Sequence, residues 1–258
     1  MLRAAMAKFS SPEGKAAGVH RLSDLAYNKL RYAISEGQIA AGTRLIELEL
    51  TRTLNMGRTP IHDALVRLVG DGLVESVPNA GFFVRHLTLE DIEMNNEIRA
   101  ALEGLAVRVA CRRGFSDMQL IEMEHACDLM AQAHENKDPR GSAQADFRFH
   151  QALIALANNP RLDAAIRASH MLFLTWSRSV PAETYLKLNT GVLAEHRQIV
   201  EALRQRNAAE AERLLQRSFD NKERLAEQVR STKMSQALRK VSVLGEFGHE
   251  ISSKEIQR

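Results

Sequence analysis

The segment between Leu45 and Val84 constrains the fold of this chain most, because a helix start signal is followed there by an apolar stripe. Thr59 can cap a helix N-terminus through its hydroxyl oxygen, and Pro60 suits the first helical position, where its missing N–H costs nothing. The pattern predicts a short helix over Pro60–Asp71 that fits the major groove of DNA. Its apolar stripe consists of Ile61, Ala64, Leu65, Leu68 and Val69, and its opposite face carries His62, Asp63, Arg67 and Asp71.

Short elements with clear turn signals surround this helix. Apolar residues at a 3.6-residue period predict two helices before it, and two β-like runs with turn residues between them predict a hairpin after it. Three helices and a hairpin make a winged helix-turn-helix, which we expect over residues 20–86. The remaining predicted helices span Leu22–Gly37 and Ile46–Leu54, and the predicted strands span Leu73–Val77 and Phe82–Arg85.

Bulk composition does not decide whether the chain binds nucleic acid. It contains 35 Lys and Arg against 32 Asp and Glu, a net charge of +3, so the placement of individual cations has to decide. Cys111 and Cys127 lack CxxC spacing and are expected to be reduced thiols of a cytoplasmic protein. No apolar run reaches about 18 residues, so we expect no membrane span. Residues 1–19 show no sustained period and are expected to form a mobile arm.

Helical periodicity continues almost without interruption from Leu89 to Val229. Thr88, with Asp91 three residues later, is a capping-box variant that marks the start. We expect a mainly α protein in which residues 87–232 form an antiparallel bundle of six to seven helices, followed by a weakly structured tail over 233–258. The predicted helices are Leu89–Arg113, Asp117–Asn136, Ser142–Ala157, Pro160–Ser179, Tyr185–Arg206 and Ala208–Val229.

Two ordered series of motifs carry a family resemblance. The first comprises Leu30-Arg31-x-x-Ile34, Gly37-x-Ile39-x-x-Gly42-x-Arg44-Leu45-x-Glu47-x-Glu49-Leu50, Arg58-Thr59-Pro60, Ala64-Leu65-x-Arg67-Leu68, Gly72-Leu73-Val74 and Gly81. The second comprises Ile98-Arg99-x-x-Leu102-Glu103, Asp146-x-x-Phe149-His150, Asn158/Asn159 and Glu195-His196. Over roughly Leu22–Val229 the chain thus resembles the GntR superfamily of bacterial transcription regulators, in the FadR-like branch with a helical FCD effector domain.

The resemblance implies a set of DNA-contacting residues. Arg58 matches an arginine that meets the operator, and Arg67 is either a phosphate contact or a surface cation of the helix. The family often has arginine where this chain has His62, and the FadR protein has arginine where this chain has Leu48, so we expect a different operator sequence. His62 either contacts DNA or is merely solvated. The implied contacts are Arg58, Thr59, His62, Arg67, Asn79 and the wing-tip Gly81.

The resemblance also implies an effector pocket in the bundle. Asp146 and His150 are four residues apart on one helix face, and His196 comes from a later helix. A carboxylate and imidazoles suit Zn²⁺, Ni²⁺ or Mn²⁺, but Ser218 stands where metal-binding relatives have a further histidine. The implied effector residues are Arg99, Asp146, His150, His196 and Arg178.

Several alternatives for this pocket stay open. A metal ion could be held weakly, with water or the effector completing its coordination. The pocket could instead be polar and metal-free, or a further ligand could exist that the sequence does not reveal. The histidines could also be hydrogen-bonded core residues, and Arg99 could simply pair with Glu103. His125, His134 and His170 are expected to be ordinary.

The leading hypothesis is a homodimeric cytoplasmic regulator, not an enzyme. It would bind double-stranded operator DNA, usually as a repressor, and respond to a small organic acid. The alternative is a metal-dependent hydrolase or lyase that uses Asp146, His150 and His196. We favour the regulator, because the chain has no HExxH-like base motif and an enzyme would leave the winged helix unexplained.

Overall fold

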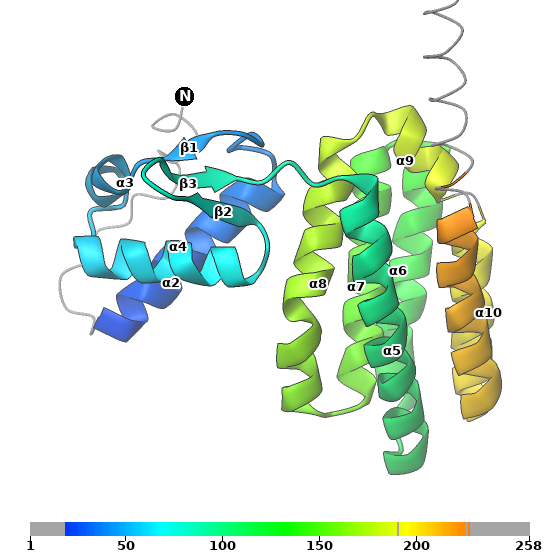
Figure 1. The fold of residues 1–258 in the computed structure, drawn as a ribbon. Coiled ribbons are helices and arrows are strands. Elements are labelled where there is room, and N and C mark those ends of the chain that lie inside the picture. The colour runs from blue at the N-terminus through cyan, green and yellow to red at the C-terminus, as the bar shows by residue number, and fades with distance from the viewer. Residues whose placement is uncertain (1–18, 190, 225–226, 228–258) are drawn as a thin grey trace, which may run out of the picture.

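A computed structural model describes residues 19–189, 191–224 and 227 of the chain. A small helix-and-sheet part lies beside a helical bundle, and one extended segment after the last strand joins them (Figure 1). The structure is mainly helical, as predicted. The expected tail at 233–258 and residues 1–18 of the expected arm lie outside the described residues. Within the described part, no helix has the length and hydropathy of a membrane span.

The N-terminal part is a winged helix-turn-helix, as predicted. Its core consists of apolar residues from α2 and α4, such as Leu30, Ile61 and Leu65, which are fully buried. The strands form an antiparallel sheet in the order β1-β3-β2. The elements are α2 (Val19–Ser35), β1 (Arg44–Leu45), α3 (Glu47–Leu54), α4 (Arg58–Gly70), β2 (Val74–Val77) and β3 (Gly81–Val84).

One local prediction in this part is wrong, and one short strand was not predicted. Thr59 does not cap α4, because the helix begins at Arg58 and Gly57 is the N-cap. Pro60 still lies in the first turn, where its missing N–H needs no partner. The sequence pattern also missed β1, which is too short to show alternation and exists only through its pairing with β3.

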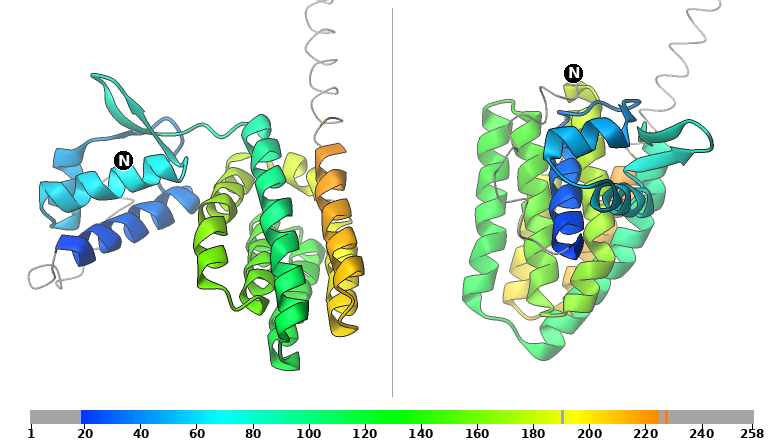
Figure 2. Two further views of the ribbon diagram at one scale, coloured as in Figure 1. Left: turned by 60° about the horizontal axis from the view of Figure 1, so that its bottom comes forward. Right: turned by 90° about the vertical axis from the view of Figure 1, so that its left-hand side faces the viewer.

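The wing projects from the N-terminal part as a narrow hairpin (Figure 2). Its turn needs positive φ angles at two residues, Asn79 (φ 60°) and Gly81 (φ 97°). Asparagine tolerates this left-handed region and glycine adopts it without a steric penalty. A Cβ on Gly81 would approach only the Arg44 side chain, at 3.9 Å. Gly81 is therefore required by the backbone angle and not by a lack of space.

The bundle consists of long helices with polar start signals. Thr88 forms a capping box with Asp91, as predicted, and Asp138 and Asn159 cap helices that begin with proline. Residues 208–224 form a further helix beside α10. The other helices are α5 (Leu89–Arg113), α6 (Asp117–Glu135), α7 (Pro139–Leu156), α8 (Pro160–Ser179), α9 (Ala182–Leu188) and α10 (Val192–Arg204).

Two helix boundaries in the bundle differ from the prediction. The helix expected over Tyr185–Arg206 is two helices, α9 and α10, because Gly191 adopts a left-handed φ of 86° between them. The helix expected from Ser142 begins at Pro139, since the Asp138 side chain accepts a hydrogen bond from the Arg140 N–H. Pro139 is thus the first residue of the helix, a position that suits proline.

Replacing Thr88 with alanine should lower the free energy of unfolding by about 1 kcal/mol. The Thr88 hydroxyl accepts from the Asp91 N–H at 3.1 Å, and the Thr88 N–H donates to the Asp91 carboxylate at 2.8 Å. Urea unfolding followed by circular dichroism measures the loss. Thr53→Ala is the matched control, because the exposed Thr53 hydroxyl only donates to a carbonyl of its own helix. Equal losses in both variants would contradict the capping role.

Candidate functional site

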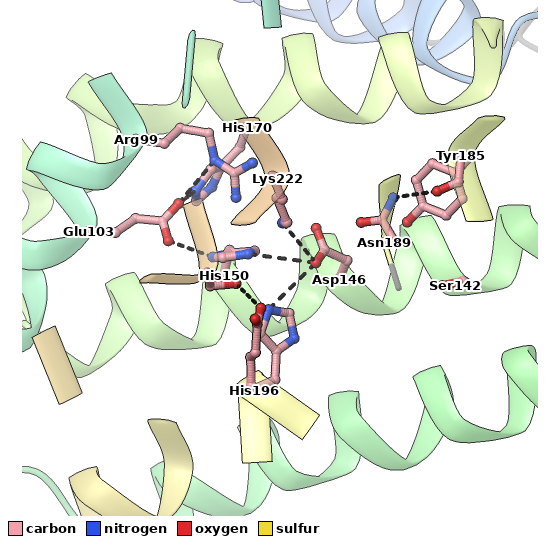
Figure 3. Close-up of polar contacts among 12 residues, drawn as sticks. Arg99, Glu103, Ser142, Asp146, His150, His170, Tyr185, Asn189, His196 and Lys222 are labelled. Carbon is pink, nitrogen blue, oxygen red and sulfur yellow. Dashed lines mark hydrogen bonds and ion pairs between the residues drawn. The ribbon is translucent and has the colours of Figure 1, made fainter. Parts of the chain in front are cut away.

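Seven ionisable side chains lie buried together inside the bundle (Figure 3). None is more than 7% exposed, and five different helices contribute to the group. Buried charges are costly unless they pair with one another or with a ligand, so this group needs internal partners. We call it the polar cluster. Its members are Arg99 and Glu103 of α5, Asp146 and His150 of α7, His170 of α8, His196 of α10, and Lys222 of the 208–224 helix.

Glu103 is the centre of one half of the polar cluster. Arg99 Nε and His170 Nε2 donate to its Oε1 at 3.0 Å each, and His150 Nδ1 donates to its Oε2 at 2.5 Å. Burial alone would raise the pKa of Glu103, but His150 and Arg99 outweigh it and hold that pKa well below its usual value. Glu103 is therefore an ionised acceptor, and the facing nitrogens of both histidines carry protons.

Asp146 is the centre of the other half. Its Oδ1 lies 3.6 Å from His196 Nε2, 3.7 Å from His150 Nε2 and 3.6 Å from Lys222 Nζ. Burial alone would raise the pKa of Asp146, but Lys222 and His150 outweigh it and keep that pKa well below normal. These gaps are too long for hydrogen bonds. Among the described residues, both Asp146 oxygens and His150 Nε2 have no hydrogen-bond partner.

The three donors of Asp146, His150 and His196 fit a metal-ligand arrangement. One ligand atom from each lies within 4.8 Å of the others, and ligand atoms about 2.0–2.2 Å from a tetrahedral ion stand roughly 3.4 Å apart. A neutral His150 that donates from Nδ1 to Glu103 would present its Nε2 lone pair to an ion beside Asp146. Sequence reasoning placed these three residues together, and the structure brings them together.

His196 is held in its ligating form by its surroundings. Its ring stacks on Phe149 with centroids 3.8 Å apart and an interplanar angle of 3°. Burial lowers the pKa of His196 well below the usual value, and although Asp146 opposes this, the net effect favours the neutral imidazole. A neutral imidazole is the form that binds a metal ion.

Ser218 completes no metal site in this structure. Its hydroxyl donates to Glu195 Oε2 at 2.7 Å, and Asn221 donates to the same carboxylate. Lys222, one turn later on the same helix, is the residue that reaches Asp146. Burial lowers the pKa of Lys222, and Asp146 acts against this effect.

Sequence reasoning missed three members of the polar cluster. His170 was expected to be ordinary, which is wrong, because it binds Glu103 from a position 67 residues away. Glu103 was considered only as an i+4 partner of Arg99; the structure contains that pair, but its further partners His150 and His170 were not predicted. Lys222 gave no signal, because a lysine on an amphipathic helix normally faces solvent.

Arg178 lies apart from the polar cluster. It donates to the Ser35 carbonyl at 2.9 Å and to Gln144 Oε1 at 2.8 Å, and it forms an ion pair with Glu36. These contacts connect α8 with the C-terminal end of α2. The structure therefore places Arg178 between the two parts of the chain, and its predicted contact with an effector stays a prediction.

A small pocket adjoins the polar cluster at Lys222. Aromatic side chains of α8 and amide side chains form its walls, and Asn96 Oδ1 and Asn189 Oδ1 have no hydrogen-bond partner in the described part of the chain. Its lining consists of Leu89, Ile92, Glu93, Asn96, Phe173, Trp176, Asn189, Lys222 and Glu223, so its walls carry two carboxylates besides the ammonium group. The ammonium group can donate to a ligand and the unpaired amide oxygens can accept, so the pocket suits a small polar ligand that has both acceptors and donors.

Two of the predicted DNA-contacting residues, Arg58 and Gly81, line an open groove between α3, the start of α4 and β3. The Arg58 side chain is 84% exposed, and Glu47 accepts from Arg58 Nε at 2.9 Å and pairs with His62 Nδ1 at 2.7 Å. Arg67 instead donates to Asp24 at 2.5 Å and covers the Tyr27 ring. This favours the surface-cation alternative for Arg67. Thr59 is exposed in the first turn of α4, and Asn79 and Gly81 lie at the wing tip.

Comparisons with known proteins point to the same kind of protein as the sequence motifs do. The family described as bacterial regulatory proteins, gntR family, matches residues 22–84, and the FCD domain family matches residues 96–221. An uncharacterized HTH-type transcriptional regulator of the TAR-I ttuE-ttuC' intergenic region from Agrobacterium vitis is 37% identical over 61% of this chain and 95% of its own length. A probable D-xylose utilization operon transcriptional repressor from Paenarthrobacter nicotinovorans is 29% identical over 66% of this chain and 73% of its own length. The crystal structure of a putative transcriptional regulator GntR from Rhodococcus sp. RHA1 is 28% identical, covers 80% of this chain and 97% of its own, and has a TM-score of 0.64.

Proposed function

This chain belongs to the GntR family of DNA-binding transcription regulators and carries an FCD domain, and we propose that it is a homodimeric repressor released from its operator by a small carboxylate-bearing metabolite. The single observation that carries the proposal is the polar cluster, whose unpaired donors and acceptors adjoin a pocket. A bundle that served only to hold the chain together would gain stability from apolar residues there. The enzyme alternative is set aside, because the families and relatives are transcription regulators.

A carboxylate suits the charges of the polar cluster. Arg99 Nη1 is buried and has no hydrogen-bond partner among the described residues, and its guanidinium lies over the Phe173 ring at 4.8 Å. Lys222 faces the neighbouring pocket. An anion that accepts from these cations would satisfy groups that otherwise stay unpaired in a low-dielectric interior.

FCD domains can bind metal ions, and Asp146, His150 and His196 are the residues that would hold one here if Lys222, 3.6 Å from Asp146 Oδ1, moved away. Their unpartnered donor atoms and their spacing fit Zn²⁺, Ni²⁺ or Mn²⁺. When bound, such an ion would supply a positive centre for the effector carboxylate. With Ser218 bound to Glu195, the described part of the chain provides three protein ligands at this site.

Helix α8 would connect the effector pocket to the DNA-binding part. His170 on α8 binds Glu103 in the polar cluster, and Arg178 on the same helix binds the end of α2. A second connection runs through the junction before α5, where Arg85 pairs with Asp91 at 2.7 Å and donates to the Gly72 carbonyl. A ligand that shifts α8 or the start of α5 would thus change the position of the winged helix.

We expect the protein to shift its own upstream intergenic DNA in an electrophoretic mobility assay, and one small organic acid to reverse the shift. The same acid should raise the melting temperature, because a ligand at 100 times its Kd stabilises the folded state by about 2.7 kcal/mol. The uncharged amide of that acid is the control and should do neither. Absence of a DNA shift at low salt would refute the regulator, and an acid that releases DNA without stabilising the protein would refute the pocket.

A further inference from the structure

We propose that the ammonium group of Lys222 takes the place of a divalent ion beside Asp146, so that this chain's site carries its own cation. Lys222 Nζ is 3.6 Å from Asp146 Oδ1, as His196 Nε2 is, and His150 Nε2 is 3.7 Å from the same oxygen. Three nitrogens therefore surround one carboxylate oxygen at nearly equal distances. Lys222 is thus a partner of the same oxygen that a metal ion bound by Asp146, His150 and His196 would need.

The charge of Lys222 opposes a metal ion at this site. An ion bound to Asp146 Oδ1 at about 2.1 Å would lie no more than roughly 6 Å from the ammonium. Both would be buried, since Lys222 is 7% and Asp146 is 1% exposed, so their repulsion would be weakly screened. Metal binding would therefore require Lys222 to leave Asp146.

Aromatic side chains hold Lys222 in place. Its Nζ lies 5.2 Å from the centroid of the Phe173 ring and 5.7 Å from that of Phe219. The Arg99 guanidinium covers the same two rings. Cation–π contacts of this kind add to the attraction of Asp146 and disfavour withdrawal of the lysine.

The polar cluster is also electrically complete without a metal. Two cationic side chains, Arg99 and Lys222, stand against two carboxylates, Glu103 and Asp146. Lys222 lines the small pocket as well, so the ammonium presents to a ligand the positive charge that a metal would otherwise present. This last step rests on the proposed function, whereas the exclusion of metal does not.

Removal of the lysine charge should create a metal site. Full-length protein is purified as wild type, as Lys222→Met and as Lys137→Met, an exposed control lysine in the turn after α6. After equilibration with Zn²⁺ and gel filtration, elemental analysis should find about one zinc per chain only in Lys222→Met. Calorimetric titration with Zn²⁺ should show at least tenfold tighter binding in Lys222→Met than in wild type. Wild type that binds zinc as tightly as Lys222→Met would overturn the proposal.

Further variants separate charge from structure. Lys222→Arg keeps the charge and should stay free of zinc, while Lys222→Gln removes it with little change in polarity and should bind zinc even if Lys222→Met unfolds. Adding Asp146→Asn to Lys222→Gln should abolish the binding, and adding Ser218→His should tighten it. Zinc bound equally by Lys222→Arg and Lys222→Gln would refute the charge argument. DNA binding by wild type is measured in parallel, so failure of the proposed function is seen independently of zinc.

Discussion

Replacing Glu103 with alanine is expected to reduce the free energy of unfolding by about 3–5 kcal/mol, the largest effect of any single substitution considered for stability. Glu103 is completely buried and accepts hydrogen bonds from Arg99, His150 and His170. Its removal leaves the Arg99 charge without its ionic partner and two imidazole N–H groups without acceptors. Removal of one partner from a buried ion pair is far more costly than removal of the pair.

Urea unfolding at pH 7 measures this loss, with Glu210→Ala as the control. Glu210 lies at the surface and, among the described residues, its carboxylate pairs with Arg213 on its own helix, so the control should lose far less stability than Glu103→Ala. A loss below about 1 kcal/mol in Glu103→Ala would show that Glu103 is not the acceptor that the structure indicates.

The pH dependence of stability in wild type and Glu103→Gln is a second test of the same interaction. Because the pKa of Glu103 is lowered in the folded state, its ionised form stabilises the protein above the ordinary value of 4.5. That contribution is lost as the pH falls from 4.5 through the lower folded pKa. The stability difference between wild type and Glu103→Gln should therefore be largest at neutral pH and shrink in acid. A difference that grows in acid would contradict the sign of the shift.

The winged helix-turn-helix could be predicted because its signals are local. The apolar stripe of Ile61, Ala64 and Leu65 and the turn at Asn79–Gly81 each lie within a few residues of the element that they specify. The exceptions show the limit of local signals. Strand β1 exists only through pairing with Phe82 and Phe83, and the split of the helix expected over Tyr185–Arg206 depends on one glycine angle.

The candidate site could be predicted only in part, for a related reason. Asp146 and His150 share a helix face, and the motif order pointed to His196. His170 and Lys222 have no such neighbours in sequence, and their partners come from other helices. Whether a lysine lies inside or outside a bundle is decided by helix rotation, which periodicity fixes only approximately.

Arg58→Ala is expected to weaken specific operator binding by about 1–3 kcal/mol while the fold stays intact. The Arg58 side chain is 84% exposed beside the groove between α3 and β3, and its internal partner is the surface carboxylate of Glu47. Loss of such an exposed ion pair changes stability by at most about 1 kcal/mol. An effect on DNA binding would therefore reflect lost DNA contacts and not unfolding.

Fluorescence anisotropy with operator and random duplexes at fixed salt separates the two ways in which Arg58 could act. If Arg58 reads a base, Arg58→Ala should weaken operator binding and leave random-duplex binding nearly unchanged. If it contacts a phosphate, both should weaken and the salt slope should fall by about 1. Arg213→Ala, an exposed arginine of the 208–224 helix, is the matched control and should change neither affinity. Unchanged operator affinity in Arg58→Ala would mean that the start of α4 does not enter the groove of DNA, because an arginine so exposed at that position could not avoid the duplex.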